Sequence, residues 1–184
     1  MPNLSLRFLL LAGALALVLA ALTHSGTAGA ATKRATVLAQ VDALRVETWR
    51  LQRLMGKPRT PTSYTERTTR SDDYRVWVRN LWQKRLQVAR AQVENPPNRS
   101  AWLCIHRYER HPEQGWRTRT GNGFYGGLQM NIAFQQAYGP ELLRRKGTAD
   151  RWTPYEQMWV AERARRSGRG FYPWPNTARY CGLI

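Results

Sequence analysis

Two neighbouring segments, Trp102-Leu-Cys-Ile-His-Arg-Tyr-Glu109 and Gly121-Asn-Gly-Phe-Tyr-Gly-Gly-Leu-Gln129, carry the features that decide the fold of this chain. The first predicts a short apolar helix that ends in an acidic side chain. The second is rich in glycine, which lets backbone approach a polymeric ligand closely. One carboxyl group on an otherwise aromatic and basic surface is what glycosidic-bond chemistry needs as a proton donor.

Glu109 has both a functional and a plain interpretation. Helical spacing places Trp102, Ile105 and Glu109 on one face of the predicted helix. A buried face and the negative end of the helix dipole both disfavour the charged carboxylate, as a general acid requires. The basic residues nearby favour the charged form, so the spacing alone leaves open whether Glu109 is an acid catalyst or an ordinary surface glutamate.

Other site chemistries find little support in the sequence. Gly121-Asn122-Gly123 and Gly126-Gly127 are also ordinary turn signals, and no Gly-Lys-Ser/Thr follows them as in a phosphate-binding loop. No HExxH, Ser-His-Asp or Cys-His arrangement is apparent. Beyond the N-terminal segment only His106 and His111 remain, so we expect neither a metal site nor a cofactor.

The N-terminal thirty residues are typical of a secretory signal. Arg7 precedes an apolar run, Phe8–Leu22, which is shorter than the roughly twenty residues that span a bilayer. The pattern Ala28-Gly29-Ala30 is typical of a signal-peptidase site. We predict that residues 1–30 are removed after Ala30, which leaves a secreted, wall-associated chain without a transmembrane segment; an uncleaved anchor is the alternative.

Charge and cysteine content indicate a partner and a cross-link. The formal net charge of +17 attracts polyanions, and for an exported protein the anionic polymers of a cell wall fit better than nucleic acid. We therefore expect no specific nucleic-acid partner, although charge-driven nucleic-acid binding is a weaker alternative. Cys104 and Cys181 are the two cysteines, and a disulfide between them is the default for an exported chain; free thiols or a metal pair are the alternatives.

Residues 31–97 predict a basic, coiled-coil-like helical hairpin. Apolar residues recur at helical spacing on either side of a proline-containing break at Lys57–Thr62, and the second helix begins after the capping residue Ser71. One interpretation is an arm that docks on a wall or membrane surface through Trp77 and Trp82. The plainer one is a helical pair packed on itself or on the rest of the chain.

Residues 98–184 predict a separate domain of short helices, dense in aromatic residues, with a small β-hairpin around Gly121–Gly127. Three helices are expected: Ala101–Glu109 with Asn98 or Ser100 as its cap, Asn131–Tyr138, and one from the capping box Thr153–Glu156 to Gly168.

Several motifs of this domain occur together and in the same order in one known family. That family has a Trp-x-x-(I/V)-x-x-x-Glu helix, then N-T-G-N-G-Y-Y-G-G-L-Q-F, then E/Q-Q-I-x-V-A-E-R and G-x-x-x-W-P. The matching segments here are Trp102–Glu109, Arg119–Met130, Glu156–Arg163 and Gly170–Pro175. Residues 101–182 therefore resemble the catalytic domain of the resuscitation-promoting factors, a transglycosylase-like family with a lysozyme-related fold.

The resemblance implies a mainly α fold of the α+β lysozyme-like kind, in which Glu109 matches the catalytic acid. Thr120 and Gln157 match positions that contact the glycan. The substrate-binding candidates are Thr120, Asn122, Tyr125, Gly127, Gln129, Gln157 and Trp174, and the aromatic side chains that could stack on sugars are Trp116, Tyr125, Tyr138 and Trp174.

This sequence departs from the family pattern at two places. The family has Cys immediately before the Glu and in a Trp-Pro-x-Cys motif, whereas this chain has Tyr108 at the first place and its cysteines at Cys104 and Cys181. The resemblance thus implies a shifted bridge. The family's Glu-Ser-Gly-Gly-Asn-Trp is also replaced by the longer Glu109-Arg-His-Pro-Glu-Gln-Gly-Trp116, which alters the loop beside the acid.

The resemblance implies cleavage of the β-1,4 bond between N-acetylmuramic acid and N-acetylglucosamine in peptidoglycan glycan strands. A lytic transglycosylase needs Glu109 alone, as acid and then base. A two-carboxylate hydrolase needs a partner, for which Glu113 is the nearest candidate in sequence. The alternative from another class is an exported wall-binding module that keeps the groove without turnover.

Overall fold

The computed structural model describes residue 32 and residues 35–184. The predicted signal peptide, residues 1–30, lies outside the described residues. In the described part of the chain, no helix combines the length and the apolar character needed to cross a membrane. The described residues divide into two compact units, the first containing residues 35–46 and Thr62–Lys84 and the second Glu47–Pro61 and Arg85–Ile184.

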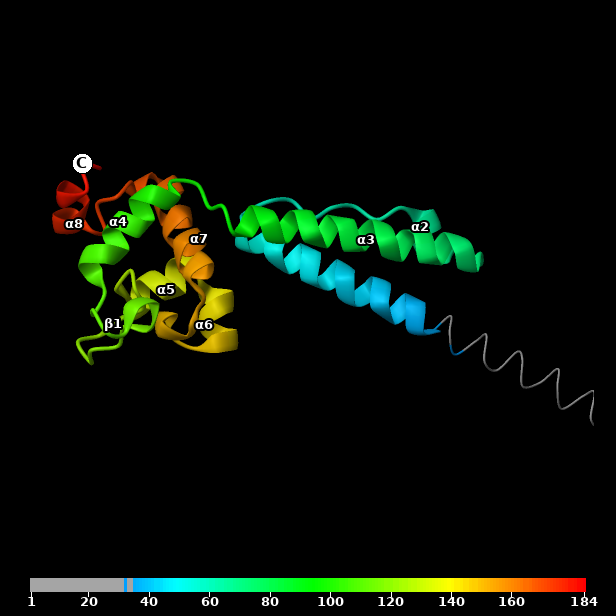
Figure 1. The fold of residues 1–184 in the computed structure, drawn as a ribbon, viewed down its shortest axis with the longest axis horizontal. Helices are drawn as coiled ribbons and strands as arrows, with labels where there is room; N and C mark the ends of the chain where they lie inside the picture. The colour runs from blue at the N-terminus through cyan, green and yellow to red at the C-terminus, as the bar shows by residue number, and fades with distance from the viewer. Residues whose placement is uncertain (1–31, 33–34) are drawn as a thin grey trace, which may run out of the picture. The chain divides into compact units, whose positions relative to one another are not determined.

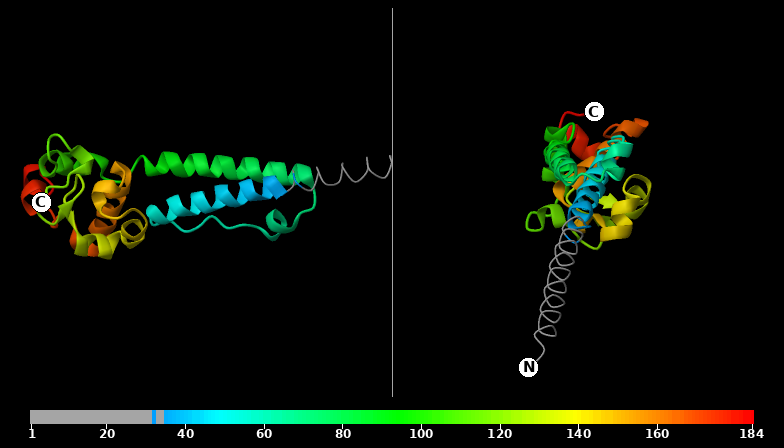
Figure 2. Two further views of the ribbon diagram at one scale, coloured as in Figure 1. Left: turned by 90° about the horizontal axis from the view of Figure 1, so that it is seen from below. Right: turned by 90° about the vertical axis from the view of Figure 1, so that its right-hand side faces the viewer.

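The first unit is helical. A helix covers residues 35–54, and its part within this unit runs beside α3 (Asp72–Val93) in both Figure 1 and Figure 2. The short α2 (Tyr64–Thr68) is capped by the Ser63 hydroxyl, and its Glu66 accepts a hydrogen bond from Trp82 Nε1. The helical hairpin expected from the sequence is therefore present.

The two tryptophans suggested as surface anchors lie in different environments. Trp82 is fully buried together with Val78, so it contributes to the core of the unit and is not available to a membrane or wall surface. Trp77 is 53% exposed and contacts the Tyr74 ring. The burial of Trp82 favours the plainer interpretation of a helical pair packed on itself.

The second unit contains the aromatic domain. Figure 1 shows its helices gathered around α5, with the β-hairpin at one edge. Its elements in chain order are α4 (Arg99–Glu109), η1 (Gly115–Arg117), β1 (Phe124–Tyr125), β2 (Met130–Asn131), α5 (Ile132–Tyr138), α6 (Pro140–Lys146), η2 (Ala149–Arg151), α7 (Pro154–Ala164), the π-helical turn η3 (Arg165–Arg169) and α8 (Pro175–Tyr180). The mainly α fold with a small hairpin is confirmed.

Local sequence signals set most of the helix ends. The Asn131 side chain caps α5, and Thr153 and Glu156 form the expected capping box of α7. Two ends differ from the prediction. The Asn98 side chain makes no cap bond, since it binds Glu162 instead. The α-helix that was expected to reach Gly168 ends at Ala164, because a π-helical turn follows in which Gly168 has φ 94°.

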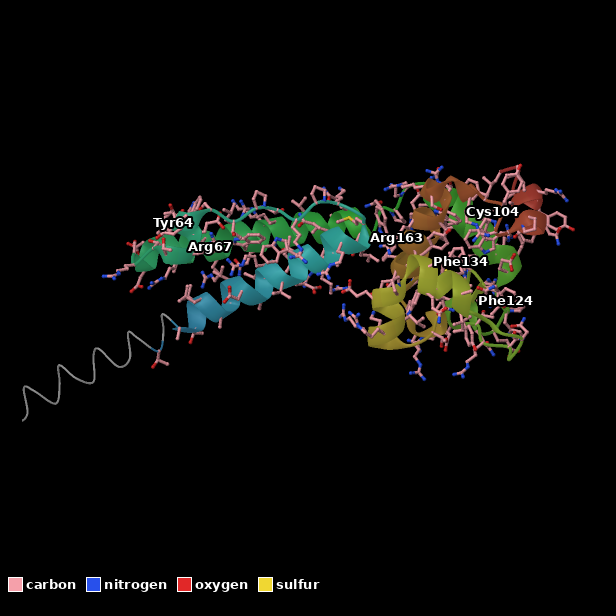
Figure 3. All side chains as sticks on the ribbon, turned by 180° about the vertical axis from the view of Figure 1, so that it is seen from behind. Tyr64, Arg67, Cys104, Phe124, Phe134 and Arg163 are labelled. Carbon is pink, nitrogen blue, oxygen red and sulfur yellow. A yellow bond between two sulfur atoms is a disulfide. The ribbon has the colours of Figure 1, made fainter. Side chains whose placement is uncertain are left out.

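The hairpin is short, and only one of its two faces packs on the domain. β1 and β2 pair antiparallel, with Tyr125 opposite Met130. Met130 and Leu128 are buried, whereas Phe124 is 42% exposed. Figure 3 shows Phe134 of α5 within the domain and Phe124 out on the hairpin. The hairpin therefore presents one face to the core and the other to solvent.

The core lies between α4, α5, α7 and α8. Trp102 packs on Phe171 and on Trp174, whose rings lie at centroid distances of 4.9 and 5.3 Å. The buried apolar side chains of this core include Trp102, Ile105, Leu128, Met130, Phe134, Met158, Trp159, Val160, Trp174 and Ala178. Large aromatic side chains supply this core with more apolar area per residue than aliphatic ones, which suits a small domain.

The ends of the two long helices belong to the same unit as the domain and are fastened to it. Arg163 of α7 donates to the carbonyls of Arg53 and Leu54, at the end of the helix over residues 35–54, and also to the Tyr138 carbonyl. Trp159 Nε1 donates to the Val93 carbonyl at the end of α3, at 2.9 Å. The bonds to the Leu54, Tyr138 and Val93 carbonyls satisfy groups that helix ends leave without an internal partner.

Candidate active site

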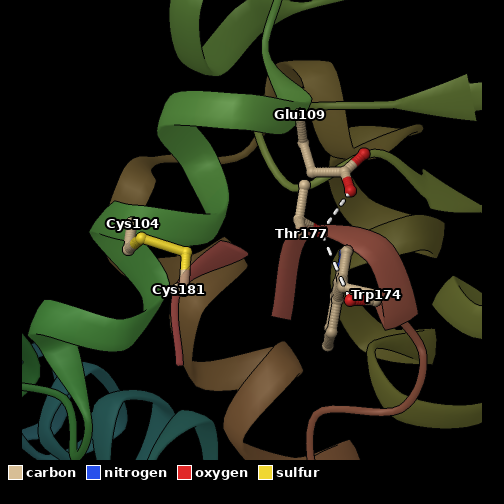
Figure 4. The surroundings of a disulfide bond; sticks show 5 residues. All are labelled: Cys104, Glu109, Trp174, Thr177 and Cys181. Carbon is tan, nitrogen blue, oxygen red and sulfur yellow. Dashed lines mark hydrogen bonds between the residues drawn. A yellow bond between two sulfur atoms is a disulfide. The ribbon is translucent and has the colours of Figure 1, made fainter. Parts of the chain in front are cut away.

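The carboxylate of Glu109 stands at the last residue of α4 and faces α8. The Thr177 hydroxyl donates to Glu109 Oε1 at 2.6 Å, and the same hydroxyl lies 3.3 Å from the Trp174 carbonyl (Figure 4). Thr177 is 8% exposed, whereas Glu109 is half-buried. A half-buried carboxylate fixed through one oxygen leaves its other oxygen for a ligand.

A disulfide joins the two helices that hold this pair. Cys104 of α4 is bonded to Cys181, which follows α8, as predicted from the sequence (Figure 4). Cys104 lies before Glu109 on α4, and Cys181 lies after Thr177, so the cross-link and the hydrogen bond connect the same two elements. The bridge therefore limits how far the Glu109 carboxylate can move from Thr177.

The start of α4 is fixed by a buried carboxylate. Glu162 Oε2 accepts from Asn98 Nδ2 at 3.1 Å and from Trp102 Nε1 at 3.3 Å. Burial alone would raise the pKa of Glu162, but hydrogen bonds from Arg165, Asn98 and Arg166 and the charge of Arg165 hold that pKa below its ordinary value. Glu162 is thus a charged anchor for the helix that carries Glu109.

The His106 side chain connects α4 to the glycine-rich segment and to Trp116. Its Nδ1 lies 3.1 Å from the Gly127 carbonyl, which can only accept, so this nitrogen carries the proton. The ring stacks on Trp116 at 3.8 Å. Burial lowers the pKa of His106 and the charge of Arg110 adds to this effect, whereas the bond to Gly127 opposes it. A Cβ on Gly127 would lie 2.4 Å from His106 Nδ1, so this contact requires glycine.

Gln157 supports the same segment from α7. Its side chain is fully buried, and Nε2 contacts the carbonyls of Trp116, Ala149 and Trp152. A Cβ on Gly126 would lie 2.5 Å from Gln157 Oε1. The resemblance assigned Gln157 to the glycan; its amide nitrogen contacts carbonyls within the domain, whereas its Oε1 is buried without a hydrogen-bond partner in the described part of the chain.

The altered loop after Glu109 is ordered by hydrogen bonds from its ends. The buried Thr118 hydroxyl donates to the Gly115 carbonyl at 2.6 Å and accepts from the His111 backbone nitrogen at 2.9 Å. The Gly127 nitrogen donates to the Trp116 carbonyl at 3.0 Å. Glu113 lies exposed in this loop. The loop after Glu109 differs from that of the family, but it still leads to Trp116, whose backbone is hydrogen-bonded to the glycine-rich segment.

A groove of about 240 Å³ borders the hairpin, α5 and the connection that leads to α8. The side chain of Trp174 forms part of its wall, and the carbonyl of the same residue is the second partner of the Thr177 hydroxyl. No acidic residue lines the groove. Its lining residues are Phe124, Gln129, Met130, Asn131, Ala133, Phe134, Ala137, Arg169, Pro173 and Trp174.

The structure distributes the predicted substrate-binding residues over three environments. Thr120 and Asn122 are exposed at the tip of the glycine-rich segment, and Gln129 lines the groove. Tyr125 is half-buried, with Arg119 6.0 Å from its ring centroid. The remaining candidates, Gly127, Gln157 and Trp174, are buried.

The aromatic candidates for sugar stacking differ in the same way. Trp174 is 4% exposed and donates to the Leu128 carbonyl, so it offers little free ring surface to a sugar. Trp116 is half-buried beneath the His106 ring. Tyr125 and Tyr138 are also half-buried. Phe124, which the sequence did not single out, is the exposed aromatic side chain in the groove.

Thr177 and Arg169 were not expected from the sequence. The sequence did contain a signal for Thr177, because this residue occupies the cysteine position of the family's Trp-Pro-x-Cys motif. The other cysteine of the family immediately precedes the catalytic Glu, so the motif indicated that position 177 lies near Glu109. Arg169 is one of several arginines in a basic segment, and nothing in its spacing distinguishes it. Across residues 35–184, no group of three or more His, Cys, Asp or Glu side chains could hold a metal ion.

Comparison with known proteins shows what this part of the chain is similar to. Residues 98–177 match the sequence profile of the family described as "Transglycosylase-like domain". The matched segment contains Glu109, the glycine-rich hairpin, the groove and Thr177. A search among curated proteins gave no significant match to the chain.

Proposed function

We propose, from the transglycosylase-like domain at residues 98–177, that this protein cleaves the β-1,4 bond between N-acetylmuramic acid and N-acetylglucosamine in peptidoglycan. The observation that carries the proposal is the Glu109 carboxylate, which accepts a hydrogen bond from a Thr177 hydroxyl that also lies 3.3 Å from the carbonyl of the groove residue Trp174. A carboxyl group whose position is fixed by the fold is what proton donation to a bound glycan needs.

In the first step Glu109, in its protonated form, gives its proton to the glycosidic oxygen. The bond from that oxygen to C1 of the muramyl residue breaks, and positive charge develops on C1. The resulting Glu109 carboxylate accepts the Thr177 hydrogen bond, which stabilises the negative charge left by proton transfer. The departing sugar leaves with a free hydroxyl.

In the second step the 6-hydroxyl of the same muramyl residue attacks C1. Glu109 takes the proton of that hydroxyl, the new bond closes a 1,6-anhydro ring, and the acid form is regenerated. One carboxyl group thus serves both steps. A hydrolase of the usual kind would need a second carboxylate about 5–9.5 Å from the first, and Glu113, the nearest candidate in sequence, lies exposed in the loop after Glu109.

We also propose that the protein is exported and acts at the cell wall. The net charge of +17 suits a wall rich in phosphate and carboxylate groups. The Cys104–Cys181 disulfide suits an oxidising compartment. Sequencing the N-terminus of the secreted protein tests this part, because cleavage after Ala30 is expected, and recovery of the chain only in the cytoplasm would contradict it.

Product analysis tests the reaction itself. Purified peptidoglycan is incubated with the mature chain, and the soluble fragments are examined by mass spectrometry. Fragments that end in 1,6-anhydromuramic acid are expected. Fragments that end in a reducing sugar would instead show hydrolysis. Binding to peptidoglycan without release of fragments would show a wall-binding module.

A further inference from the structure

Arg169 is the charged side chain of the groove. It is the single charged residue in the lining, where it lies with the polar side chains of Gln129 and Asn131 and with the aromatic residues Phe124 and Trp174. A cation among apolar and neutral polar side chains selects for a ligand with negative charge. The proposed substrate is a glycan, so the question is which of its groups carries that charge.

The charge of Arg169 is not neutralised by the protein. The two other arginines of η3, Arg165 and Arg166, pair with Glu162 at 2.9 and 3.0 Å. In the part of the chain that the structure describes, no carboxylate pairs with Arg169. Its guanidinium group instead lies close enough to the Tyr138 hydroxyl to lower the pKa of that group. The guanidinium group therefore keeps donors for an anionic ligand.

The backbone fixes where Arg169 stands. It lies between Gly168 and Gly170, which have φ 94° and 55°, a left-handed conformation that favours glycine. The Arg169 carbonyl accepts from the Tyr172 nitrogen at 3.2 Å. Hydrogen bonds from Ser167 and from Arg169 lower the pKa of Tyr138. The turn thus fixes the backbone of Arg169 at the groove that this residue lines.

The groove that Arg169 lines is connected to Glu109 through a single residue. Trp174 forms part of the groove wall, and its carbonyl lies 3.3 Å from the Thr177 hydroxyl that binds Glu109. A glycan whose scissile bond lies at Glu109 and whose chain extends along the groove would bring a neighbouring substituent to Arg169.

We infer that Arg169 binds an ionised carboxylate carried by a muramyl residue of the glycan strand, and so determines which strands the groove accepts. This inference rests on the proposed function. The planar guanidinium group matches a carboxylate with two parallel hydrogen bonds. Two sources present this chemistry: the lactyl carboxylate of a muramyl residue without a stem peptide, and the carboxylates of the stem peptide.

Binding is tested in the Glu109→Gln protein, which would hold the glycan without turnover. Two pairs of soluble tetrasaccharides of alternating N-acetylglucosamine and N-acetylmuramic acid are compared by calorimetry. One pair lacks stem peptides and has its lactyl carboxyls free or amidated. The other pair carries stem peptides with their carboxyls free or amidated. The pair that shows a preference for the free acid identifies the source.

We expect the free acid of one pair to bind about tenfold more tightly than its amide. Adding Arg169→Gln should remove this preference, and Arg169→Lys should keep part of it. Arg144→Gln, which removes the same charge from an exposed position on α6, should leave it intact. No preference in either pair, or a preference that survives Arg169→Gln, would overturn the inference.

The failure of this inference is distinguishable from that of the proposed function. If wild-type protein releases anhydromuramyl fragments from peptidoglycan while the tetrasaccharides show no carboxylate preference, only the role of Arg169 is wrong. If no tetrasaccharide binds and no fragment is released, both proposals are wrong.

Discussion

The Thr177 hydroxyl donates a 2.6 Å hydrogen bond to Oε1 of Glu109 and so joins α8 to the last residue of α4. Its single proton serves either Glu109 or the Trp174 carbonyl, which lies 3.3 Å from the same oxygen. Rotation of one hydroxyl therefore lets Thr177 donate to a Glu109 carboxylate or accept from a protonated Glu109. This rotation allows Thr177 to remain hydrogen-bonded to Glu109 while Glu109 acts first as an acid and then as a base.

Thr177→Val keeps the shape of the side chain and removes the hydroxyl. We expect kcat for peptidoglycan cleavage to fall by about tenfold with KM little changed, because the lost bond stabilises the carboxylate formed in the reaction. Thr177→Ser restores the hydroxyl and should restore most of kcat. Initial rates on a soluble glycan measure both constants. Equal losses in the Val and Ser variants would show that the methyl group, and not the hydroxyl, is what matters.

The stability of the domain should fall as the pH drops below about 6.5, in part because of His106. Its pKa is lowered in the folded state by burial and by Arg110, so the unfolded chain binds its proton first. The stability present above the unfolded pKa is therefore lost as the pH falls towards the folded pKa, and the loss levels off below it. Urea unfolding between pH 7.5 and 5 measures this change.

His106→Gln keeps a hydrogen-bond donor beside Gly127 and does not titrate, so its unfolding free energy should depend less on pH than that of the wild type. His111→Gln, at an exposed position in the neighbouring loop, is the matched control and should retain the wild-type dependence. If the two variants have the same pH profile, His106 is not the source of the effect.

Gly127→Ala tests the close contact between the hairpin and α4. The new Cβ would lie 2.4 Å from His106 Nδ1 and 2.9 Å from the Trp116 Cα, so we expect the domain to lose about 2–3 kcal/mol of unfolding free energy. Gly123→Ala is the control, since nothing lies within 4 Å of its Cβ, and only the cost of φ 86° is expected, about 1 kcal/mol. Thermal unfolding distinguishes them; a smaller loss for Gly127→Ala than for Gly123→Ala would contradict the contact.

The Cys104–Cys181 bridge closes a loop with a sequence separation of 77 residues. In the chain-entropy model, replacing both cysteines with serine should lower the unfolding free energy by about 4 kcal/mol. Reduction of the wild type should reproduce most of this loss, and the double variant should not respond to reductant. A double variant as stable as the oxidised wild type would show that the bridge adds nothing to stability.

Elements with strong local signals could be predicted from the sequence. The capping box at Thr153 and Glu156 starts α7, and the Asn131 side chain caps α5, because each cap depends on residues three or four positions apart. The end of α7 could not be predicted in this way. Gly168 predicted the end of the α-helix at that residue, but a π-helical turn begins at Arg165. Arg165 and Arg166 of this turn form ion pairs with Glu162.

The candidate site residues also differ in whether local sequence or contacts between distant segments determine them. The disulfide could be predicted because the chain offers two cysteines, and it is present, whereas the catalytic role of Glu109 stays a prediction from its place in the motif. The environment of Gln157 does not follow, because its burial depends on carbonyls of three separate segments that only the folded chain brings together. Thr177 and Arg169 were missed for the same reason, since their partners Glu109 and Tyr138 lie far from them in sequence.

The central claim is that the Glu109 carboxyl group is the acid that breaks the glycan. Glu109→Gln keeps the size of the side chain and its ability to accept from Thr177, but it cannot donate a catalytic proton. Wild type and variant are incubated with the same purified peptidoglycan, and soluble anhydromuramyl fragments are quantified by mass spectrometry. We expect the variant to bind the polymer as the wild type does and to release fragments at least about a hundredfold more slowly. Equal release by the two proteins would contradict the claim.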